Sequence, residues 1–307
     1  MAVGRSGARL RTARPRLGFG RRFEPIFYLL PALIVFAVFV IVPLGQGIWL
    51  SLFNWDGLSP ATWAGFDNYA EIVLDPDLRS GFLHSAYLVI FWTVIPIILG
   101  LFLAAVLSSP RMRGVPFARA IIFLPQIIPL VAVSIVWRWV LEPEGPINTA
   151  LRAVGLGAFA RGWLGDYNWS LTAIGAVACW VVTGFCMVLF LAGIQNISTE
   201  LYDAAKVDGA SGLQQFIHVT LPGLRQEIAV AVVVTVISAL RAFDLVYVMT
   251  GGGPGNSSTV PGWQVYRRAF FYGEIGSASA LGVTLAIVIL IVVFALTRLG
   301  RRSADDE

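Results

Sequence analysis

Residues 196–226 read NISTELYDAAKVDGASGLQQFIHVTLPGLRQ, a polar stretch between two long apolar runs. Thr199 can cap a helix that begins at Glu200, because a threonine oxygen accepts a backbone N–H of the first helical turn. Gly209 supplies the positive φ that ends such a helix near Asp208. The first half of the stretch therefore predicts one short, capped helix.

A second short helix is predicted directly after Gly209. Ser211 and Gln214 have the spacing of a capping box, in which each side chain bonds the backbone of the other residue. Pro222 is expected to end this helix before the next apolar run. The whole stretch thus predicts two helices joined by a sharp turn, too polar to lie within a membrane.

The first helix has a face of small residues with charges at its edges. Ala204 and Ala205 share this face with Leu201 and Asp208, and Glu200 lies at the leading end. Small side chains let the backbone of another protein approach closely, and the flanking charges fix its register. We expect this helix to dock in a groove of a partner.

The rest of the composition predicts an all-α membrane protein. Hydrophobic residues make up 57% of the 307 residues and charged residues 13%, against about 25% charged in an average soluble domain. Each of six apolar runs is long enough to cross a hydrocarbon core of about 30 Å as a helix. The expected spans are 26–49, 86–107, 117–141, 171–194, 228–248 and 278–296. The expected domains are a basic cytoplasmic segment 1–25, a six-helix transmembrane domain 26–299 with its cytoplasmic loop 196–225, and a cytoplasmic tail 300–307.

The basic residues orient these spans. Fifteen of the 22 Lys and Arg residues fall on the side of the two termini and the 196–225 loop, and five fall in the opposite loops. This bias predicts cytoplasmic N and C termini. The Arg-rich start lacks the interleaved aromatic residues of a nucleic-acid site. The apolar run after it is too long for a cleavable signal peptide and has no small-residue cleavage site.

The chain lacks an energy-converting motif of its own. The glycine-rich run at 251–258 has no lysine, and a P-loop needs one beside its Ser or Thr. The only lysine of the chain is Lys206, so we interpret this run as an outer turn before a re-entrant segment. The two cysteines, Cys179 and Cys186, are seven residues apart in the fourth span, and the two histidines, His84 and His218, lie elsewhere, so no metal-ligand cluster is expected. No catalytic constellation is found, so the chain is not expected to be an enzyme.

Ionisable residues are rare within the expected spans. They are Arg138, Arg241 and Asp244. Arg241 and Asp244 are three residues apart, so on one helix they could pair and lower their cost of burial; a structural ion pair and a substrate contact are both open. A line of buried carboxylates, typical of proton-coupled carriers, is missing. This disfavours an ion-coupled secondary transporter, which we keep as the alternative.

The 196–226 stretch resembles the EAA loop of permease subunits in ATP-binding-cassette importers. That loop has the pattern EAA, three residues, G, nine residues, then I, one residue, LP. The matching positions here are Asp203, Ala204, Ala205, Gly209, Val219, Leu221 and Pro222. Asp203 replaces the usual Glu and Val219 the usual Ile, and the shorter Asp203 leaves the partner of this carboxylate open.

Four further stretches resemble the sugar-permease branch that includes the maltose and glycerol-phosphate importers. They are AGFDNY at 64–69, FLPQIIP at 123–129, WRW at 137–139 and FDLVYVMTGGGPGNSS at 243–258. The last is similar to the larger subunit of each pair, equivalent to the F component of the maltose importer. His84 and Ser85 depart from the Asn and Thr expected there.

The resemblance implies a type I importer permease fold in a bacterial cytoplasmic membrane. It implies that the loop couples to a separate ATPase. The implied coupling residues are Glu200, Asp203, Ala204, Ala205, Asp208, Gly209, Leu221 and Pro222. The implied partners are a second permease subunit, two ATP-binding subunits that hold ATP and Mg²⁺, and an extracytoplasmic sugar-binding protein. A heterodimer is expected by analogy, although six spans alone could form a homodimer.

A sugar path between the two permease subunits calls for aromatic and polar side chains near mid-membrane. The candidates are Gln126, Trp137, Trp139, Trp180, Arg241 and Asp244. Packing or interface anchoring explains the aromatic ones equally well. Pro125 and Pro129 are expected to bend the third span and free carbonyl groups for a cavity. The sequence does not specify which sugar is carried.

Overall fold

The computed structural model describes the backbone of residues 24–108 and 114–305. The expected basic segment lies outside this range up to residue 23, as do Arg111 and Arg113 of the charge bias. The chain divides into two units, residues 1–46 and 47–307. Each is described by itself.

The first unit contributes most of one apolar span. Its elements are α1 (Glu24–Phe36), η2 (Ala37–Ile41), which is a π-helical turn, and the first part of α2 (Val42–Leu50). The helix Tyr28–Leu50 is long and apolar enough to cross a membrane, and none of its candidate window is buried. The first expected span is therefore a helix.

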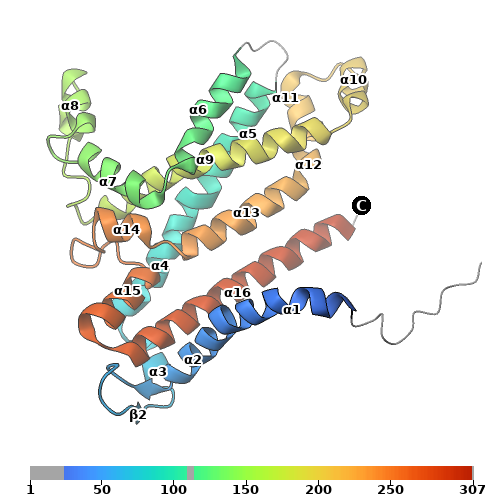
Figure 1. The fold of residues 1–307 in the computed structure, drawn as a ribbon. Helices are drawn as coiled ribbons and strands as arrows, with labels where there is room; N and C mark the ends of the chain where they lie inside the picture. Colours follow the sequence, from blue (N-terminus) through green and yellow to red (C-terminus); the bar gives the residue numbers. More distant parts are fainter. Residues whose placement is uncertain (1–23, 109–113, 306–307) are drawn as a thin grey trace, which may run out of the picture. The chain divides into compact units, whose positions relative to one another are not determined.

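The second unit is helical except for a two-stranded antiparallel hairpin in the part that the structure describes (Figure 1). Its first elements are β1 (Phe53–Asn54), β2 (Thr62–Trp63), α3 (Asp67–Leu74), α4 (Pro76–Val89), η3 (Ile90–Val94), α5 (Ile95–Leu107), α6 (Val115–Ile127), α7 (Leu130–Val140), α8 (Pro146–Ala153) and η4 (Gly157–Phe159). They are followed by α9 (Ser170–Asn196), α10 (Thr199–Val207), α11 (Gly212–Gln215), η5 (Phe216–Thr220), α12 (Leu221–Gly223), α13 (Arg225–Leu240), α14 (Asp244–Met249), α15 (Pro261–Arg267), η6 (Arg268–Tyr272) and α16 (Ile275–Asp305).

Helix α9 is the centre of the second unit. It packs against α5, α6, α13 and η3, and most of its residues are buried. Three of its glycines, Gly175, Gly184 and Gly193, are nine residues apart, so successive ones lie on opposite faces of a helix with 3.6 residues per turn. Each glycine allows a neighbour to approach where a side chain would block it. α9 is thus enclosed on both faces.

The closest of these approaches is at Gly184. A Cβ atom there would lie 2.3 Å from the carbonyl oxygen of Ile122 and 2.9 Å from the Cα of Phe123, both on α6. The backbones of α9 and α6 are in contact here, and a helix backbone cannot move aside as a flexible side chain can. The packing of α6 on α9 depends on the missing side chain.

The third expected span is sharply broken. α6 and α7 form an angle of 98° at Ile128 and Pro129, so the bend that was expected in the span over 117–141 is present at Pro129. Ile128 is extended, with φ −76° and ψ 131°, because the residue before a proline is excluded from the helical region. Pro129 also has no N–H to continue the helix. Pro125 stays inside α6.

The fifth expected span is also interrupted. α13 ends at Leu240 and α14 begins at Asp244, so the predicted continuous helix over 228–248 is wrong. Phe243, with φ −142° and ψ −58°, is not helical. At its other end α13 forms an angle of 67° with the Gly212–Gly223 segment.

The spans can now be counted. In the described residues four helices are long and apolar enough to cross a membrane: Tyr28–Leu50, Pro76–Leu107, Ser170–Asn196 and Ile275–Arg298. The number is six if each bent pair is one span. The glycine-rich run at 251–258 is a series of turns between α14 and α15, as its composition predicted.

A network around Arg268 joins α3, η6 and α16. Its guanidinium donates to both carboxylate oxygens of Glu71, at 3.1 and 2.9 Å, and to Glu274 at 2.9 Å. It also donates to the Ser277 hydroxyl at 2.6 Å. The Arg268 side chain is only 12% exposed, so this charge is held by bonds on several sides. The network fixes the beginning of α16.

The contact at Gly184 leads to a stability prediction. Gly184→Ala places a methyl group against the α6 backbone and should destabilise the protein by about 1–3 kcal/mol, as overpacking does. Gly282→Ala on α16 is the matched control, because nothing lies within 4 Å of its added Cβ. Thermal melting of both variants in one detergent measures the difference. Equal melting temperatures would show that α6 and α9 do not depend on this contact.

Candidate functional site

The first loop helix, α10, begins one residue earlier than expected. Ser198 is its cap, and the Ser198 hydroxyl accepts the backbone N–H of Glu200 at 3.3 Å. Thr199, which the sequence predicted as the cap, is the first helical residue instead. Ser198 takes the role because its φ of −59° and ψ of 131° leave the helical region, and that is where a cap must lie.

The sharp turn after α10 is the one that the sequence predicted. Gly209 has a φ of +76°, and the following N–H, of Ala210, donates to the Ala205 carbonyl at 2.9 Å. The N–H of Gly209 donates to the Lys206 carbonyl at 3.0 Å. These two bonds satisfy carbonyl groups at the end of the helix, and they need the left-handed conformation that glycine adopts without strain.

The second arm of the loop is longer than predicted. Both bonds of the Ser211 and Gln214 capping box are present, at 3.4 and 2.7 Å. Helical structure then continues through α11, η5 and α12 to Gly223, so the expected end at Pro222 is wrong. Pro222 lies in the first turn of α12, where a missing N–H is tolerated. The chain turns instead at Leu224, which is fully buried.

Two hydrogen bonds tie the arms of the loop together. The hydroxyls of Tyr202 on α10 and Thr220 at the end of η5 are 3.0 Å apart. The Gln215 side chain donates to the Ala210 carbonyl at 2.9 Å. Thr220 is buried, so the first of these bonds is shielded from competing water. The loop is therefore a stiff two-armed element.

The outer surface of α10 is open. Glu200, Asp203, Ala204 and Asp208 are all exposed, and Ala205 is half-buried. Asp203 pairs with Lys206 at 2.8 Å, which gives a partner to the carboxylate that the sequence left open. Both side chains are more than half exposed, so this pair is worth about 0–1 kcal/mol and is easily exchanged for another.

Large apolar side chains are also exposed on both arms of the loop. Val207 is 87% exposed, Leu213 is 69% and Leu201 is 55%. Val207 and Leu213 flank the turn at Gly209, and Leu201 lies near the beginning of α10. Apolar side chains beside charged ones are typical of a surface that another protein covers.

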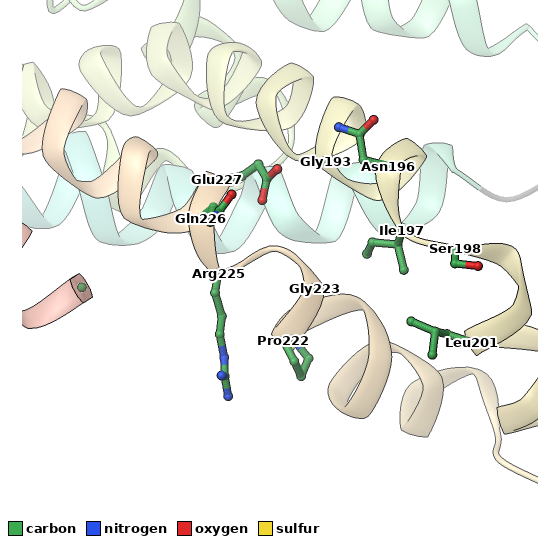
Figure 2. A pocket seen from close by; sticks show the side chains of 11 residues that line it. Gly193, Asn196, Ile197, Ser198, Leu201, Pro222, Gly223, Arg225, Gln226 and Glu227 are labelled. Carbon is green, nitrogen blue, oxygen red and sulfur yellow. The ribbon is translucent and has the colours of Figure 1, made fainter. Parts of the chain in front are cut away.

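A cavity of about 600 Å³ lies at the root of the loop (Figure 2). Figure 2 shows the lining side chains that come from the end of α9, from α10 and from residues 222–227. Gly193, Asn196, Arg225, Gln226 and Glu227 also line it, and the sequence analysis missed them. Three polar residues in a row at the beginning of an apolar helix were the available signal. Of the predicted coupling residues, Pro222 alone lines this cavity, so the others lie on a different surface of the loop.

Arg241 and Asp244 lie together in a second cavity, of about 210 Å³. It forms where the two helix breaks meet, because α14 packs against α7 and Leu130, the first residue of α7, lines the same wall. Trp92 and Ser238 also line this cavity. The sequence missed both, although Ser238 is a polar residue three positions before Arg241.

Arg241 and Asp244 are not a helical pair. α13 ends at Leu240, before Arg241, and α14 begins at Asp244. In the described part of the chain no ion pair within 4.0 Å joins the two residues. The prediction that they share one helical face is therefore wrong, because three non-helical residues separate α13 from α14. Their polar groups face a cavity, which leaves them available to a ligand.

The other path candidates lie apart from this cavity. Trp137 and Trp180 contact each other edge to face, with ring centroids 5.4 Å apart. Trp139 is 59% exposed, and Gln126 is exposed near the end of α6. None of these four lines the cavity of Arg241 and Asp244. Among the described residues we find no group of His, Cys, Asp and Glu that could hold a metal ion.

Comparisons with known proteins agree with this geometry. The family model for the "Binding-protein-dependent transport system inner membrane component" matches residues 96–305. The chain is 37% identical to the probable ABC transporter permease protein YurN of Bacillus subtilis, covering 89% of this chain and 93% of that one. It is 34% identical to the diacetylchitobiose uptake system permease protein NgcF of Streptomyces coelicolor, covering 94% and 86%.

A solved structure is similar over nearly the same length. The chain matches one in the crystal structure of a bacterial ABC transporter involved in the import of the acidic polysaccharide alginate, with a TM-score of 0.79 and 25% identity. The match covers 92% of this chain and 96% of that one. The fold is thus similar to that of a chain in an ABC importer.

The bond between Tyr202 and Thr220 can be tested directly. Tyr202→Phe removes it, and a net hydrogen-bond contribution of about 0.5–1.5 kcal/mol predicts that amide exchange in α10 quickens by about two- to tenfold. Hydrogen exchange followed by mass spectrometry measures this. Tyr272→Phe is the control, since the Tyr272 hydroxyl makes no hydrogen bond within the described chain. Unchanged exchange in α10 would mean that the arms are held by something else.

Proposed function

Because the chain belongs to the family of binding-protein-dependent transport system inner membrane components, we propose that it forms half of the translocation pathway of a sugar importer driven by ATP. The sugar class is supported by relatives such as the diacetylchitobiose permease, and by the sugar-permease motifs of the sequence. The structure of the alginate importer supports the same class. The chain lies in a bacterial cytoplasmic membrane, with both termini in the cytoplasm.

The observation that carries this proposal is the exposed, stiff loop of α10 to α12. The chain's single lysine, Lys206, lies on that loop and not in a phosphate-binding motif. Two separate ATP-binding subunits, which hold ATP and Mg²⁺, would therefore supply the energy. We place their contact on α10, through Glu200, Asp203 and the alanines beside them, because this helix offers both charge and small residues.

Stiffness is what such a coupling needs. An ATPase can shift a transporter between two states only through contacts that differ in those states. The Tyr202 and Thr220 hydroxyls connect α10 to the second arm, and the second arm leads at Leu224 into α13. A displacement of α10 is thus passed to the helix that ends at the Arg241 cavity.

We place the sugar at that cavity. Sugar hydroxyls need donors and acceptors, and Arg241, Asp244 and Ser238 offer both around an interrupted helix. The indole of Trp92 adds an aromatic wall. A second permease subunit, expected to be a different chain, would form the other half of the path. An extracytoplasmic sugar-binding protein would deliver the sugar.

The alternative, an ion-coupled secondary transporter, differs in its energy source. In vesicles that contain the assembled transporter, uptake should require ATP on the cytoplasmic side and persist when an uncoupler collapses the proton gradient. Uptake that survives ATP depletion and stops with the uncoupler would support the alternative. The sugar for this assay is found first, by binding a glycan panel to the binding protein.

Ala205→Glu tests the coupling loop. A charge on the half-buried face of α10 should leave the protein inserted and assembled with its permease partner, yet abolish sugar-stimulated ATP hydrolysis. Gly209→Asp should act in the same direction, through strain of about 1–2 kcal/mol at its positive φ. Ala61→Glu, on an exposed loop between β1 and β2, is the matched control. Normal stimulation in Ala205→Glu would refute the assignment of α10.

Asp244→Asn tests the sugar site. Loss of a charged hydrogen bond, worth about 1.5–3 kcal/mol, should raise the half-saturating sugar concentration about tenfold or more. Glu144→Gln, which changes an exposed carboxylate on another loop, should leave it unchanged. Concentration-dependent uptake measures both. An unchanged half-saturating concentration in Asp244→Asn would move the sugar elsewhere in the path.

A further inference from the structure

A third cavity, of about 340 Å³, lies between the end of α7, α8 and the beginning of α9. Its wall is made almost entirely of apolar atoms and includes three indoles. The lining residues are Trp137, Leu141, Ile147, Trp163, Trp169, Thr172, Ala173, Ala176 and Val177. It shares no lining residue with the cavity of Arg241 and Asp244.

Two of the polar groups in this wall are occupied. The Trp163 indole N–H donates to the Asn148 side chain at 2.9 Å, and the Thr172 hydroxyl is bonded to that of Tyr87 at 3.0 Å. A saccharide placed here would lose hydrogen bonds to water without replacing them, and each lost bond is costly. A hydrocarbon chain has no such groups to satisfy. The wall favours an acyl chain over a sugar.

A guanidinium lies against two of the three indoles. The Arg161 Cζ is 4.6 Å from the ring centroid of Trp169 and 5.3 Å from that of Trp163. Arg161 donates through Nε to the Phe159 carbonyl, and within the described residues no carboxylate forms an ion pair with it. Its remaining N–H groups have the geometry that binds phosphate. Arg152, in contrast, is paired with Glu144 at 2.8 Å.

The segment after α8 has the character of an element at a membrane surface. Val154, Leu156 and Phe159 are 68%, 47% and 56% exposed. Apolar side chains and indoles beside an arginine are typical of the boundary between acyl chains and headgroups. The cavity therefore opens where a phospholipid can reach it.

We propose that this cavity binds an anionic phospholipid, with one acyl chain between the three indoles and the phosphate on Arg161. The proposal goes beyond the transport function and does not depend on which sugar is carried. It also assigns Trp137, a candidate for the sugar path, to a lipid site. The bound lipid would hold α7 and α8 against the beginning of α9.

The test uses the assembled transporter in phosphatidylcholine nanodiscs that contain a phosphatidylglycerol probe with a diazirine at the end of one acyl chain. After irradiation, peptide mass spectrometry should find the label on residues of the cavity wall. Ala176→Phe should abolish this label, because Ala176 is exposed and a phenyl ring there fills the cavity without entering packed core. Excess unlabelled phosphatidylglycerol should also remove the label from the wild type.

Arg161→Gln tests the headgroup. It should lower labelling by phosphatidylglycerol about fivefold, which is the effect of one basic residue at an anionic surface. Labelling by a phosphatidylcholine probe should fall less, because the phosphate of that lipid is balanced by its own choline. Arg152→Gln is the matched control and should change neither, because Arg152 is already paired with Glu144.

Three outcomes would overturn the proposal. Labelling of the wall that persists in Ala176→Phe would place the acyl chain elsewhere. Displacement of the probe from the wild type by a neutral oligosaccharide would assign the cavity to the sugar path. Labelling of the isolated chain that disappears in the assembled transporter would show that the partner subunit covers the cavity.

Discussion

Every peptide group within hydrocarbon must find a hydrogen-bond partner, since each one left without costs several kcal/mol. This constraint explains where the helices are continuous and where they break. α9 is one continuous helix of 27 residues. The breaks at Ile128 and at Arg241 to Phe243 lie where α7 and α14 pack against each other, so the irregular backbone faces protein and a polar cavity. The proposed sugar cavity lies beside these two breaks in the helices.

Several contacts make parts of the second unit rigid. α9 is held on both faces, with α6 in backbone contact at Gly184. The loop of α10 to α12 is held by its own hydrogen bonds and joins α13 at a bend of 67°. α13 has 16 residues, about 24 Å of helix, and ends at the Arg241 cavity. One stiff helix thus connects the proposed ATPase contact with the proposed sugar site.

Two cavities of opposite chemistry lie in this unit. The one at Arg241 and Asp244 has donors and acceptors around a helix break, and suits a ligand rich in hydroxyls. The one beside Arg161 has an almost entirely apolar wall with three indoles, and suits an acyl chain. Aromatic side chains occur in both, so their number in the sequence could not distinguish a sugar contact from a lipid contact. The two cavities differ in the polar groups that their walls offer to a ligand.

The sequence by itself determined the apolar spans, the turn at Gly209 and the capping box at Ser211, because these depend on neighbours within a few residues. It also predicted the short helix α10 and the bend at Pro129. Only the tertiary structure decided that α13 stops at Leu240, that Arg241 and Asp244 face one cavity without pairing, and that Trp137 lies apart from them. Periodicity treats an apolar run as one straight helix. Where it breaks, and which side chains meet there, depends on packing between residues far apart in the chain.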